Sequence, residues 1–245
     1  MRVLVTRAEP NATRTARTLE TLGHQPIVMP LSRVERDASV AAAGLAETSG
    51  AIIVTSAEAL RTLEELEGSL TPFLQRRLYA VGRATGAAAE ALGFRDIVIG
   101  DGDGRALAAR IGKDRTRDPS TMATTPLLYL AGMPRAGGLE EELKALGISV
   151  DIRECYRMLP EEPDMNRQIE ALVTQRPEAV LCYSAESVQR LLELPLLRND
   201  RSVLQDTIFC CISEAVGDIL RPHFPDRVRV AERPSEPALL ALLPD

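Results

Sequence analysis

Short apolar runs rich in β-branched residues alternate with segments of helical periodicity along the whole chain. Val3–Thr6 is followed by the helical segment Ala12–Leu22 and then by a second apolar run, Pro26–Pro30. The further strand-like runs are Ala51–Thr55, Arg77–Val81, Asp96–Ile99, Leu127–Leu130, Ile148–Cys155, Ala179–Tyr183, Thr207–Ile212 and Arg227–Ala231. Strands that alternate with helices build parallel sheets with helices packed on their faces. The alternation predicts an α/β fold of small parallel, doubly wound sheets flanked by helices.

One of these strand–helix units occurs twice. Ala51–Leu60 matches Ala179–Val188, and both segments have the pattern strand, Ser-Ala-Glu, helix. The units that follow, Leu78–Gly86 and Phe209–Gly217, align at a similar spacing. The repeat predicts two halves. The polar stretch Gly112–Thr125 lies between them and is typical of a solvated connector.

Charge and composition exclude several classes of partner. The formal net charge is −6 and aromatic residues make up 3% of the 245 residues, which disfavours a nucleic-acid binder because such proteins need a basic face and stacking side chains. No apolar stretch reaches the length of a membrane span, and Met1–Arg7 lacks the apolar core of a secretion signal, so we expect a cytoplasmic protein. No C-x-x-C spacing occurs and the two histidines are far apart in the sequence, so no metal site is predicted.

The turns that follow the strands carry mostly small, hydroxyl and Arg side chains. In doubly wound sheets, ligands bind at the carboxyl ends of the strands. The polar residues predicted at these ends are Arg7, Thr55, Ser56, Arg83, Thr85, Arg135, Ser184, Ser213 and Ser235. Helix N-termini there present unpaired N–H groups that bind carboxylates or phosphates. The set favours an anionic small molecule, although Thr55, Ser56 and Ser184 also fit ordinary N-caps, with Thr55 and Glu58 spaced as a capping box.

Other common catalytic motifs are missing from the sequence. There is no P-loop, and Gly100–Gly104 has the wrong spacing for a dinucleotide fingerprint. A nucleophile elbow is also missing, which disfavours hydrolase chemistry. Tyr156, at the end of the run Ile148–Cys155, remains as a candidate proton donor, since a phenol can donate a proton to a leaving oxygen without a metal. The alternative is a strand-end aromatic with a structural role.

The order of several short motifs resembles the uroporphyrinogen-III synthase family along essentially the whole chain. The matching segments are 3–10 (VLVTRAEP), 51–57 (AIIVTSA), 79–85 (YAVGRAT), 146–157 (LGISVDIRECYR), 183–188 (YSAESV), 211–216 (CISEAV) and 231–235 (AERPS). No single segment is diagnostic, but their order and spacing together are specific. The chain departs from many members at Ala131, where they have Arg, and at Ala215–Val216, which replaces a threonine pair.

The resemblance implies a bilobed protein in which the chain crosses twice between the lobes. Lobe one, flavodoxin-like, would contain residues 1–34 and 157–245, and lobe two residues 38–153. The linker would be Ser32–Asp37 with Tyr156–Glu161, and the active cleft would lie between the lobes. The repeat by itself suggests two sequential domains instead. The long apolar segments Pro26–Val34 and Ile148–Met158 are compatible with two antiparallel connecting strands.

The resemblance also implies a reaction. Hydroxymethylbilane, a linear tetrapyrrole with eight carboxylates, would be closed to uroporphyrinogen III with loss of water and inversion of ring D through a spiro intermediate, without a cofactor. Tyr156 matches the family's functionally important tyrosine, and Thr85 and Ser56 match cleft positions.

Further expectations concern the opposite lobe and the partners. Ser184 and Ser213 would bind substrate from the other lobe. We expect Arg7, Arg83 and Arg135 to compensate for the departures at Ala131 and Ala215–Val216. A monomer with a transient contact to hydroxymethylbilane synthase is expected. The alternative is a non-catalytic two-lobed sensor of an anionic small molecule.

Overall fold

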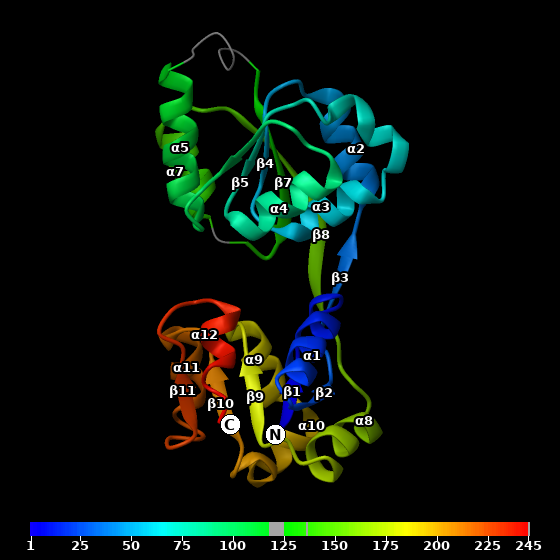
Figure 1. Cartoon of the computed structure of the whole chain (residues 1–245), viewed down its shortest axis with the longest axis vertical. Coiled ribbons are helices and arrows are strands. Elements are labelled where there is room, and N and C mark those ends of the chain that lie inside the picture. Colours follow the sequence, from blue (N-terminus) through cyan, green and yellow to red (C-terminus); the bar gives the residue numbers. More distant parts are fainter. Residues whose placement is uncertain (118–124, 136, 245) are drawn as a thin grey trace. The chain divides into compact units, whose positions relative to one another are not determined.

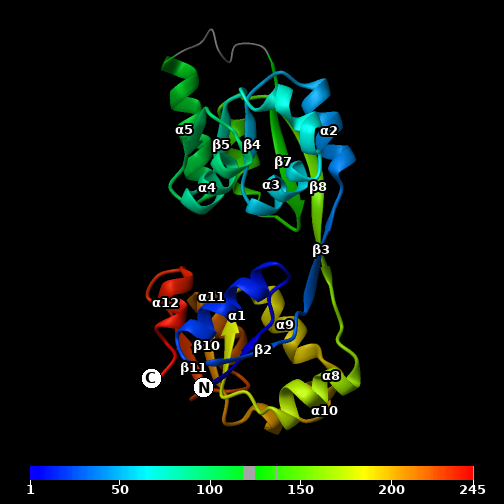
Figure 2. The same ribbon diagram turned by 45° about the vertical axis from the view of Figure 1, so that its right-hand side comes forward.

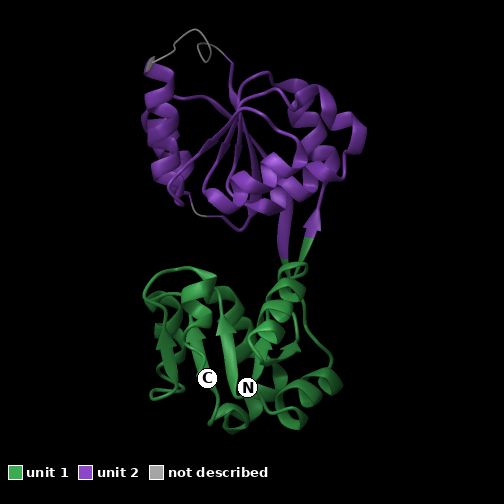
Figure 3. Ribbon diagram, in the orientation of Figure 1, with its two compact units in different colours: residues 1–34, 159–245 green, residues 35–158 purple. Residues whose placement is uncertain are grey.

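The structure is a computed structural model that describes residues 1–117, 125–135 and 137–244. The chain divides into two compact units, residues 1–34 with 159–245 and residues 35–158 (Figure 3). Two strands carry the chain from one unit into the other, β3 (Ser32–Arg36) and β8 (Val150–Pro160). Asp37 N donates to Cys155 O over 2.8 Å and Glu161 N to Leu31 O over 3.1 Å. The two strands are therefore antiparallel neighbours.

Unit 1 is built on a five-stranded parallel sheet (Figure 1). Its strands are β1 (Arg2–Val5), β2 (Gln25–Val28), β9 (Ala179–Cys182), β10 (Ile208–Cys211) and β11 (Val228–Val230). Its helices are α1 (Asn11–Thr21), α8 (Met165–Ile169), η2 (Glu170–Thr174), α9 (Ala185–Glu193), α10 (Pro195–Asn199), η3 (Arg201–Leu204), α11 (Glu214–Leu220) and α12 (Glu236–Leu240). The spatial order β2-β1-β9-β10-β11 is that of flavodoxin, in which the strand order reverses between the first and third strands, here β1 and β9.

Strand alternation in unit 1 divides the core between two faces. Leu4 and Phe209 pack with α9 and α11 residues in one cluster. Val3 and Val5 pack in another cluster with α1 and α12 residues. Because successive strand side chains point to opposite faces, a sheet covered on both sides needs continuous apolar strands. The apolar runs of the sequence meet that need.

Unit 2 carries a six-stranded sheet with the order β3-β8-β7-β4-β5-β6. Its further strands are β4 (Ile52–Val54), β5 (Leu78–Ala80), β6 (Ile97–Ile99) and β7 (Leu127–Met133). Its helices are α2 (Ala38–Glu47), α3 (Ala57–Glu64), η1 (Glu67–Phe73), α4 (Arg83–Leu92), α5 (Gly104–Arg117) and α7 (Gly138–Ala145). All neighbours from β8 to β6 are parallel, and the strand order reverses between β4 and β7.

Helices cover both faces of the unit 2 sheet. Figure 2 shows α5 on one side of the strands and α2 on the other. On the α5 side, Ile53, Tyr79 and Tyr129 pack against Leu107 of α5 and Leu143 of α7. Gly147, with φ of +66°, follows α7 in the left-handed conformation that commonly ends a helix. The predicted α/β class with parallel sheets flanked by helices is confirmed.

Two sequence predictions are wrong in detail. The segment Pro26–Val34 is not one strand but two, because β2 pairs with β1 in the unit 1 sheet whereas β3 pairs with β8 in the other sheet. The predicted connector Gly112–Thr125 is not all loop, since α5 continues to Arg117, and residues 118–124 lie outside the described part of the chain.

Candidate active site

The order of the strands in unit 2 reverses between β4 and β7, and residues that follow β4 lie beside β7 there. Ser56 is the N-cap of α3, and its Oγ accepts from Glu58 N over 3.2 Å. The Thr55 hydroxyl is 3.0 Å from the hydroxyl of Tyr129 on β7. The predicted capping box between Thr55 and Glu58 is therefore wrong by one residue, because the Tyr129 phenol takes the Thr55 side chain and Ser56 caps the helix.

Tyr156 lies on β8 opposite Gly132 of β7. The register changes here, because Ala131 pairs with Glu154 while Gly132 pairs with Tyr156, leaving Cys155 as the extra residue of a β-bulge. A Cβ added to Gly132 would be 2.1 Å from Cζ of Tyr156 and 2.5 Å from its hydroxyl oxygen. The ring occupies the space beside the Cα of Gly132, and Tyr156 is largely buried.

Burial raises the pKa of the Tyr156 phenol to about 12, and a hydrogen bond with Ser56 partly offsets that rise. The Glu58 carboxylate nearby acts in the same direction as burial and raises the pKa further. The phenol is thus neutral at physiological pH and holds a proton that it can donate. Ser56 uses its oxygen lone pair for the helix cap, so its own O–H can donate to the phenol oxygen.

Glu58 is a buried carboxylate that the sequence analysis treats only as a capping residue. Arg36 on β3 donates to its Oε2 from Nε over 3.2 Å and from Nη2 over 2.7 Å, and Arg61 pairs with its other oxygen. A buried carboxylate needs such partners to remain charged. Glu58 therefore links β3 to the helix that begins beside Tyr156.

The other predicted site residues of unit 2 differ in their exposure and in whether they pair with other side chains. Thr85 is buried in the first turn of α4, after β5, and Arg83, two residues earlier, is exposed. Arg135 is held by two carboxylates, Glu140 at 2.5 Å and Glu154 at 2.9 Å. The hydrogen bond to Glu140 raises the pKa of Arg135, so the cation is paired within the protein.

In unit 1, two of the predicted serines stand at helix starts. Ser184 caps α9 through Ser187 N at 3.1 Å. Ser213 occupies the N-cap position of α11 without a side-chain cap bond. Each follows a strand of the sheet, β9 and β10, so both lie at its carboxyl edge.

Arg7 belongs to a polar cluster that the sequence analysis missed. Its Nη1 donates to Glu236 Oε1 over 3.0 Å and to Thr15 Oγ1 over 3.2 Å. Tyr183, at the end of the strand-like run Ala179–Tyr183, donates to the same Glu236 oxygen over 2.6 Å. Glu236 follows Ser235, the N-cap of α12, and lies in the first turn of that helix. An acidic residue in a first helical turn is the only local sequence signal that points to Glu236. The sequence does not reveal its contact with Arg7, because most of the chain lies between the two residues.

Comparison with known proteins decides the family. A family model described as uroporphyrinogen-III synthase HemD matches residues 13–241. The chain belongs to the uroporphyrinogen-III synthase family. The resemblance drawn from the sequence motifs is thereby confirmed, and the sensor alternative is not favoured.

Solved uroporphyrinogen-III synthase structures share the fold. The enzyme from Helicobacter pylori aligns with a TM-score of 0.65 at 16% identity, covering 98% of this chain and 96% of that one. A mutant enzyme from the extremely thermophilic bacterium Thermus thermophilus aligns with a TM-score of 0.56 at 20% identity, with the same coverages. No curated protein sequence matches the chain significantly. The family places the chain among the lyases of tetrapyrrole biosynthesis.

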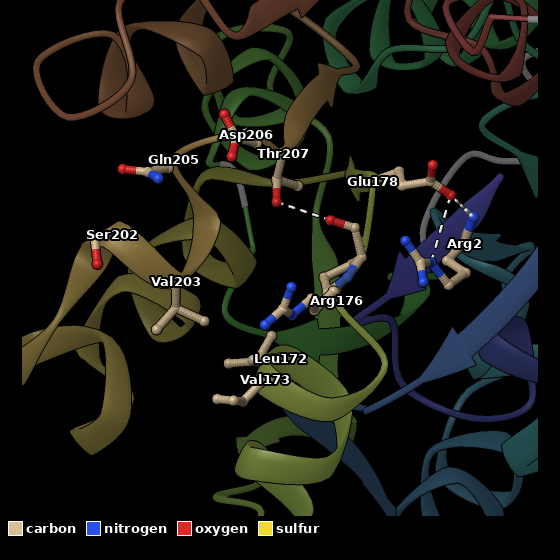
Figure 4. Close-up of a pocket in the computed structure, with 11 residues that line it drawn as sticks. Arg2, Leu172, Val173, Arg176, Glu178, Ser202, Val203, Gln205, Asp206 and Thr207 are labelled. Carbon is tan, nitrogen blue, oxygen red and sulfur yellow. Dashed lines mark hydrogen bonds and ion pairs between the residues drawn. The ribbon is translucent and has the colours of Figure 1, made fainter.

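Two pockets of unit 1 lie away from the predicted site residues. One of about 460 Å³ is bordered by Arg2, Glu178 and Thr207, at the amino ends of β1, β9 and β10 (Figure 4). Another of about 490 Å³ is bordered by Gln189, Arg198 and His223. Ligands of doubly wound sheets bind at the opposite, carboxyl edge. Neither pocket is lined by a residue that the sequence predicts to bind substrate.

Within the described residues, no group of three or more His, Cys, Asp or Glu side chains is arranged to hold a metal ion. The four cysteines are buried and unpaired as disulfides. None of the described helices combines the length and apolar character that crossing a membrane requires.

Proposed function

We propose that the chain closes hydroxymethylbilane to uroporphyrinogen III with loss of water and inversion of ring D, and that Tyr156 is the proton donor. The observation that carries this assignment of Tyr156 is its placement at the bulge of β8 beside Ser56, next to the switch point of the unit 2 sheet. A bulge that re-aims one side chain is a common feature beside active sites. The family membership supports the reaction itself.

The substrate's carboxylates call for hydrogen-bond donors that converge on it. The N-termini of α3, α4 and α9 offer unpaired N–H groups, and Thr85, Ser184 and Ser213 stand beside helix starts at the carboxyl edges of the two sheets. Such N–H groups bind anions without a basic surface. We propose that these N–H groups and hydroxyls bind carboxylate groups of the substrate.

The first chemical step is departure of the ring A hydroxyl. The Tyr156 O–H bond breaks as the carbon–oxygen bond breaks, so that water leaves, the phenol becomes a phenolate, and ring A becomes a cationic azafulvene. General acids accelerate such departures by about 10²–10⁴-fold. The substituted α-carbon of ring D then attacks the azafulvene carbon to form the spiro intermediate.

The remaining steps invert ring D. The bond between ring D and the bridge carbon to ring C breaks, which leaves a second azafulvene on ring C. The free α-carbon of ring D attacks it and then loses its proton, which the Tyr156 phenolate takes back. Each turnover thus restores the phenol, releases one water and requires no cofactor.

The competing spontaneous reaction shows that the protein must control how the substrate folds. Free hydroxymethylbilane closes without inversion to isomer I, so the protein must favour the spiro route by holding ring D in place. Carboxylates fixed at several points achieve this, which is why binding residues matter as much as the proton donor. Arg83, exposed beside Thr85, is a candidate for such a contact. Arg135 would first have to leave its carboxylate partners. The monomeric state, the cytoplasmic location and the contact with hydroxymethylbilane synthase stay predictions.

A product analysis tests the proposal. Hydroxymethylbilane made in place by its synthase is incubated with the full chain, and the oxidised products are separated by chromatography. We expect isomer III to dominate, with only isomer I in the absence of the chain. Isomer I alone in both samples would reject the synthase function.

A further inference from the structure

One carboxylate oxygen in unit 1 receives three donors from distant parts of the chain. Glu236 Oε1 accepts from the Tyr183 hydroxyl at 2.6 Å, the Thr15 hydroxyl at 2.7 Å and Arg7 Nη1 at 3.0 Å. Burial works to raise the pKa of Glu236, but the hydrogen bonds from Tyr183 and Thr15 and the Arg7 charge outweigh it and lower the pKa. The carboxylate therefore stays charged and fixed.

The Arg7 guanidinium stacks on the Tyr183 ring and bonds through Nη1, and its other nitrogens are open. Its guanidinium carbon stands 3.9 Å from the centre of the Tyr183 ring, and its Nη1 is taken by Glu236 and Thr15. Among the described residues, its Nε and Nη2 have no hydrogen-bond partner, and its side chain is 21% exposed. Nε and Nη2 together form the edge of a guanidinium that binds a carboxylate with two parallel hydrogen bonds.

The position of this open edge is the second observation. Arg7 follows β1 and Tyr183 follows β9, the two strands between which the order of the unit 1 sheet reverses. In doubly wound sheets this reversal creates the crevice in which ligands bind. Figure 1 shows α12, which begins with Glu236, near the carboxyl ends of β9 and β10.

Two other Arg–Glu arrangements show what is special here. Arg135 is bonded by Glu140 through Nε and by Glu154 through Nη1, so no such edge is left open. Arg2 pairs with Glu178 at the opposite, amino edge of the unit 1 sheet, where the first pocket lies. Arg7 alone of these three combines an open guanidinium edge with the switch point of a sheet.

We propose that Glu236 is a positioning residue that, with Tyr183 and Thr15, holds Arg7 ready to bind one carboxylate arm of the substrate. The inference rests on the proposed function and adds to it a side-chain receptor built by unit 1. Arg7 is a binding residue in this scheme, and Glu236 acts only through it. Because the contact is made in the bound substrate as well as in the transition state, it contributes mainly to KM.

Steady-state kinetics with isomer analysis test this. Glu236→Gln keeps the side-chain shape and an oxygen acceptor for Tyr183 and Thr15 but removes the charge that fixes Arg7. We expect KM for hydroxymethylbilane to rise about tenfold, with kcat within about twofold, as for loss of one charge-assisted contact. Arg7→Gln should raise KM at least as much, and Arg7→Lys should recover only part of the loss because an ammonium lacks the fork.

The double variant gives the sharpest result. If Glu236 acts through Arg7, then Arg7→Gln combined with Glu236→Gln should have the KM of Arg7→Gln alone. Glu178→Gln, which breaks the ion pair at the amino edge of the same sheet, is the matched control and should leave KM unchanged. The thermal midpoint of every variant shows that unit 1 remains folded.

The outcomes separate the two claims. If the wild-type protein makes isomer III but Glu236→Gln has the wild-type KM, the positioning role of Glu236 is overturned and the synthase function stands. Additive effects in the double variant would also overturn it, since Glu236 would then act independently of Arg7. Wild-type protein that makes only isomer I would overturn both.

Discussion

The aromatic ring of Tyr156 occupies the space that a side chain on Gly132 would need. A Cβ at Gly132 would be 2.1 Å from Cζ of the ring, and the two residues are register partners in neighbouring strands at a β-bulge. The bulge and the missing side chain thus together determine where the phenol lies. The first test of the site is therefore at the glycine.

Gly132→Ala should displace the Tyr156 ring and lower kcat by about 10²-fold, since a displacement of an ångström at a reacting group has effects of that size. Overpacking would also cost about 1–3 kcal/mol of unfolding free energy. Both are measured by kinetics and urea unfolding. Gly68→Ala, also in unit 2 and with open space around the added methyl, is the control and should change neither. A wild-type kcat in the Gly132 variant would show that the exact phenol position is unimportant.

The fold could be predicted from the sequence further than the site could. Runs such as Ile52–Val54 and Ala179–Cys182 are strands because continuous β-branched and apolar residues suit a sheet covered on both faces. The apolar segment Pro26–Val34 suggests one strand, although its two parts pair with different strands, β1 and β8. Which strands pair, in contrast, depends on contacts between distant segments.

The site shows the same division between local and distant information. Ser56 and Ser184 follow strands, and sequence alone places them at helix starts. The contact of Arg7 with Glu236 cannot be found in that way, because the two residues are 229 positions apart. The partners of Arg135 were also not visible in the sequence: it is proposed to bind substrate, and in the structure it pairs with Glu140 and Glu154.

Tyr156→Phe tests the proton donor directly. The variant keeps the ring against Gly132 and removes only the hydroxyl, so we expect kcat to fall by about 10²-fold or more while the thermal midpoint changes little. Isomer III should remain the main product, because the substrate is still held. Tyr79→Phe removes another buried hydroxyl of unit 2, 3.4 Å from Asp114, and should leave kcat unchanged. An unaltered rate in Tyr156→Phe would remove the proton-donor role.

Ser56→Ala should slow the reaction through the acidity of Tyr156. The hydrogen bond from Ser56 lowers the phenol pKa against the effect of burial, so its loss should raise that pKa above its value of about 12 and make the phenol a weaker acid. The absorbance change of the phenol on alkaline titration measures the shift. Because the α3 cap is also lost, stability should fall by about 1 kcal/mol.

Ser56→Thr separates these two effects of the serine. Threonine keeps the hydroxyl and is also a good N-cap, so both the phenol pKa and kcat should return towards wild type. If Ser56→Ala and Ser56→Thr had the same kcat, the hydroxyl would have no part in tuning Tyr156.

Stability should respond to Tyr156 at alkaline pH. The phenol titrates near 10 in the unfolded chain and near 12 in the folded one, so folding favours the protonated form. The unfolded state then loses its proton first as the pH rises, and the stabilisation, complete below pH 10, is lost between about pH 10 and 12. At pH 11 the loss from this one group is about 1.4 kcal/mol.

A comparison of unfolding free energies in urea at pH 9 and pH 11 tests this. The wild-type protein should lose about 1.4 kcal/mol more than Tyr156→Phe over that interval, because the variant lacks the titrating group. Equal losses in the two proteins would mean that the phenol pKa does not change on folding.

Arg76 supports unit 2 from outside the proposed site, and its substitution should affect stability alone. Its guanidinium donates to Gly50 O at 2.9 Å and to both Leu45 O and Thr48 O at 3.1 Å, and it also bonds the Thr48 hydroxyl. These acceptors lie at the C-terminal end of α2 and in the loop before β4, where the last helical carbonyls need partners. Burial lowers the pKa of Arg76, because the guanidinium has lost part of its contact with water.

Arg76→Met should therefore lower the unfolding free energy by about 2–4 kcal/mol, the cost of leaving several partly buried carbonyls without donors. Its neighbour Arg77 forms a half-exposed ion pair with Asp96 at 2.9 Å, and Arg77→Met should cost less than about 1 kcal/mol. Urea unfolding of both variants measures the difference, and kcat at a temperature where both remain folded should match wild type. Equal stability of the two variants would show that the guanidinium contacts of Arg76 contribute no more than a surface ion pair.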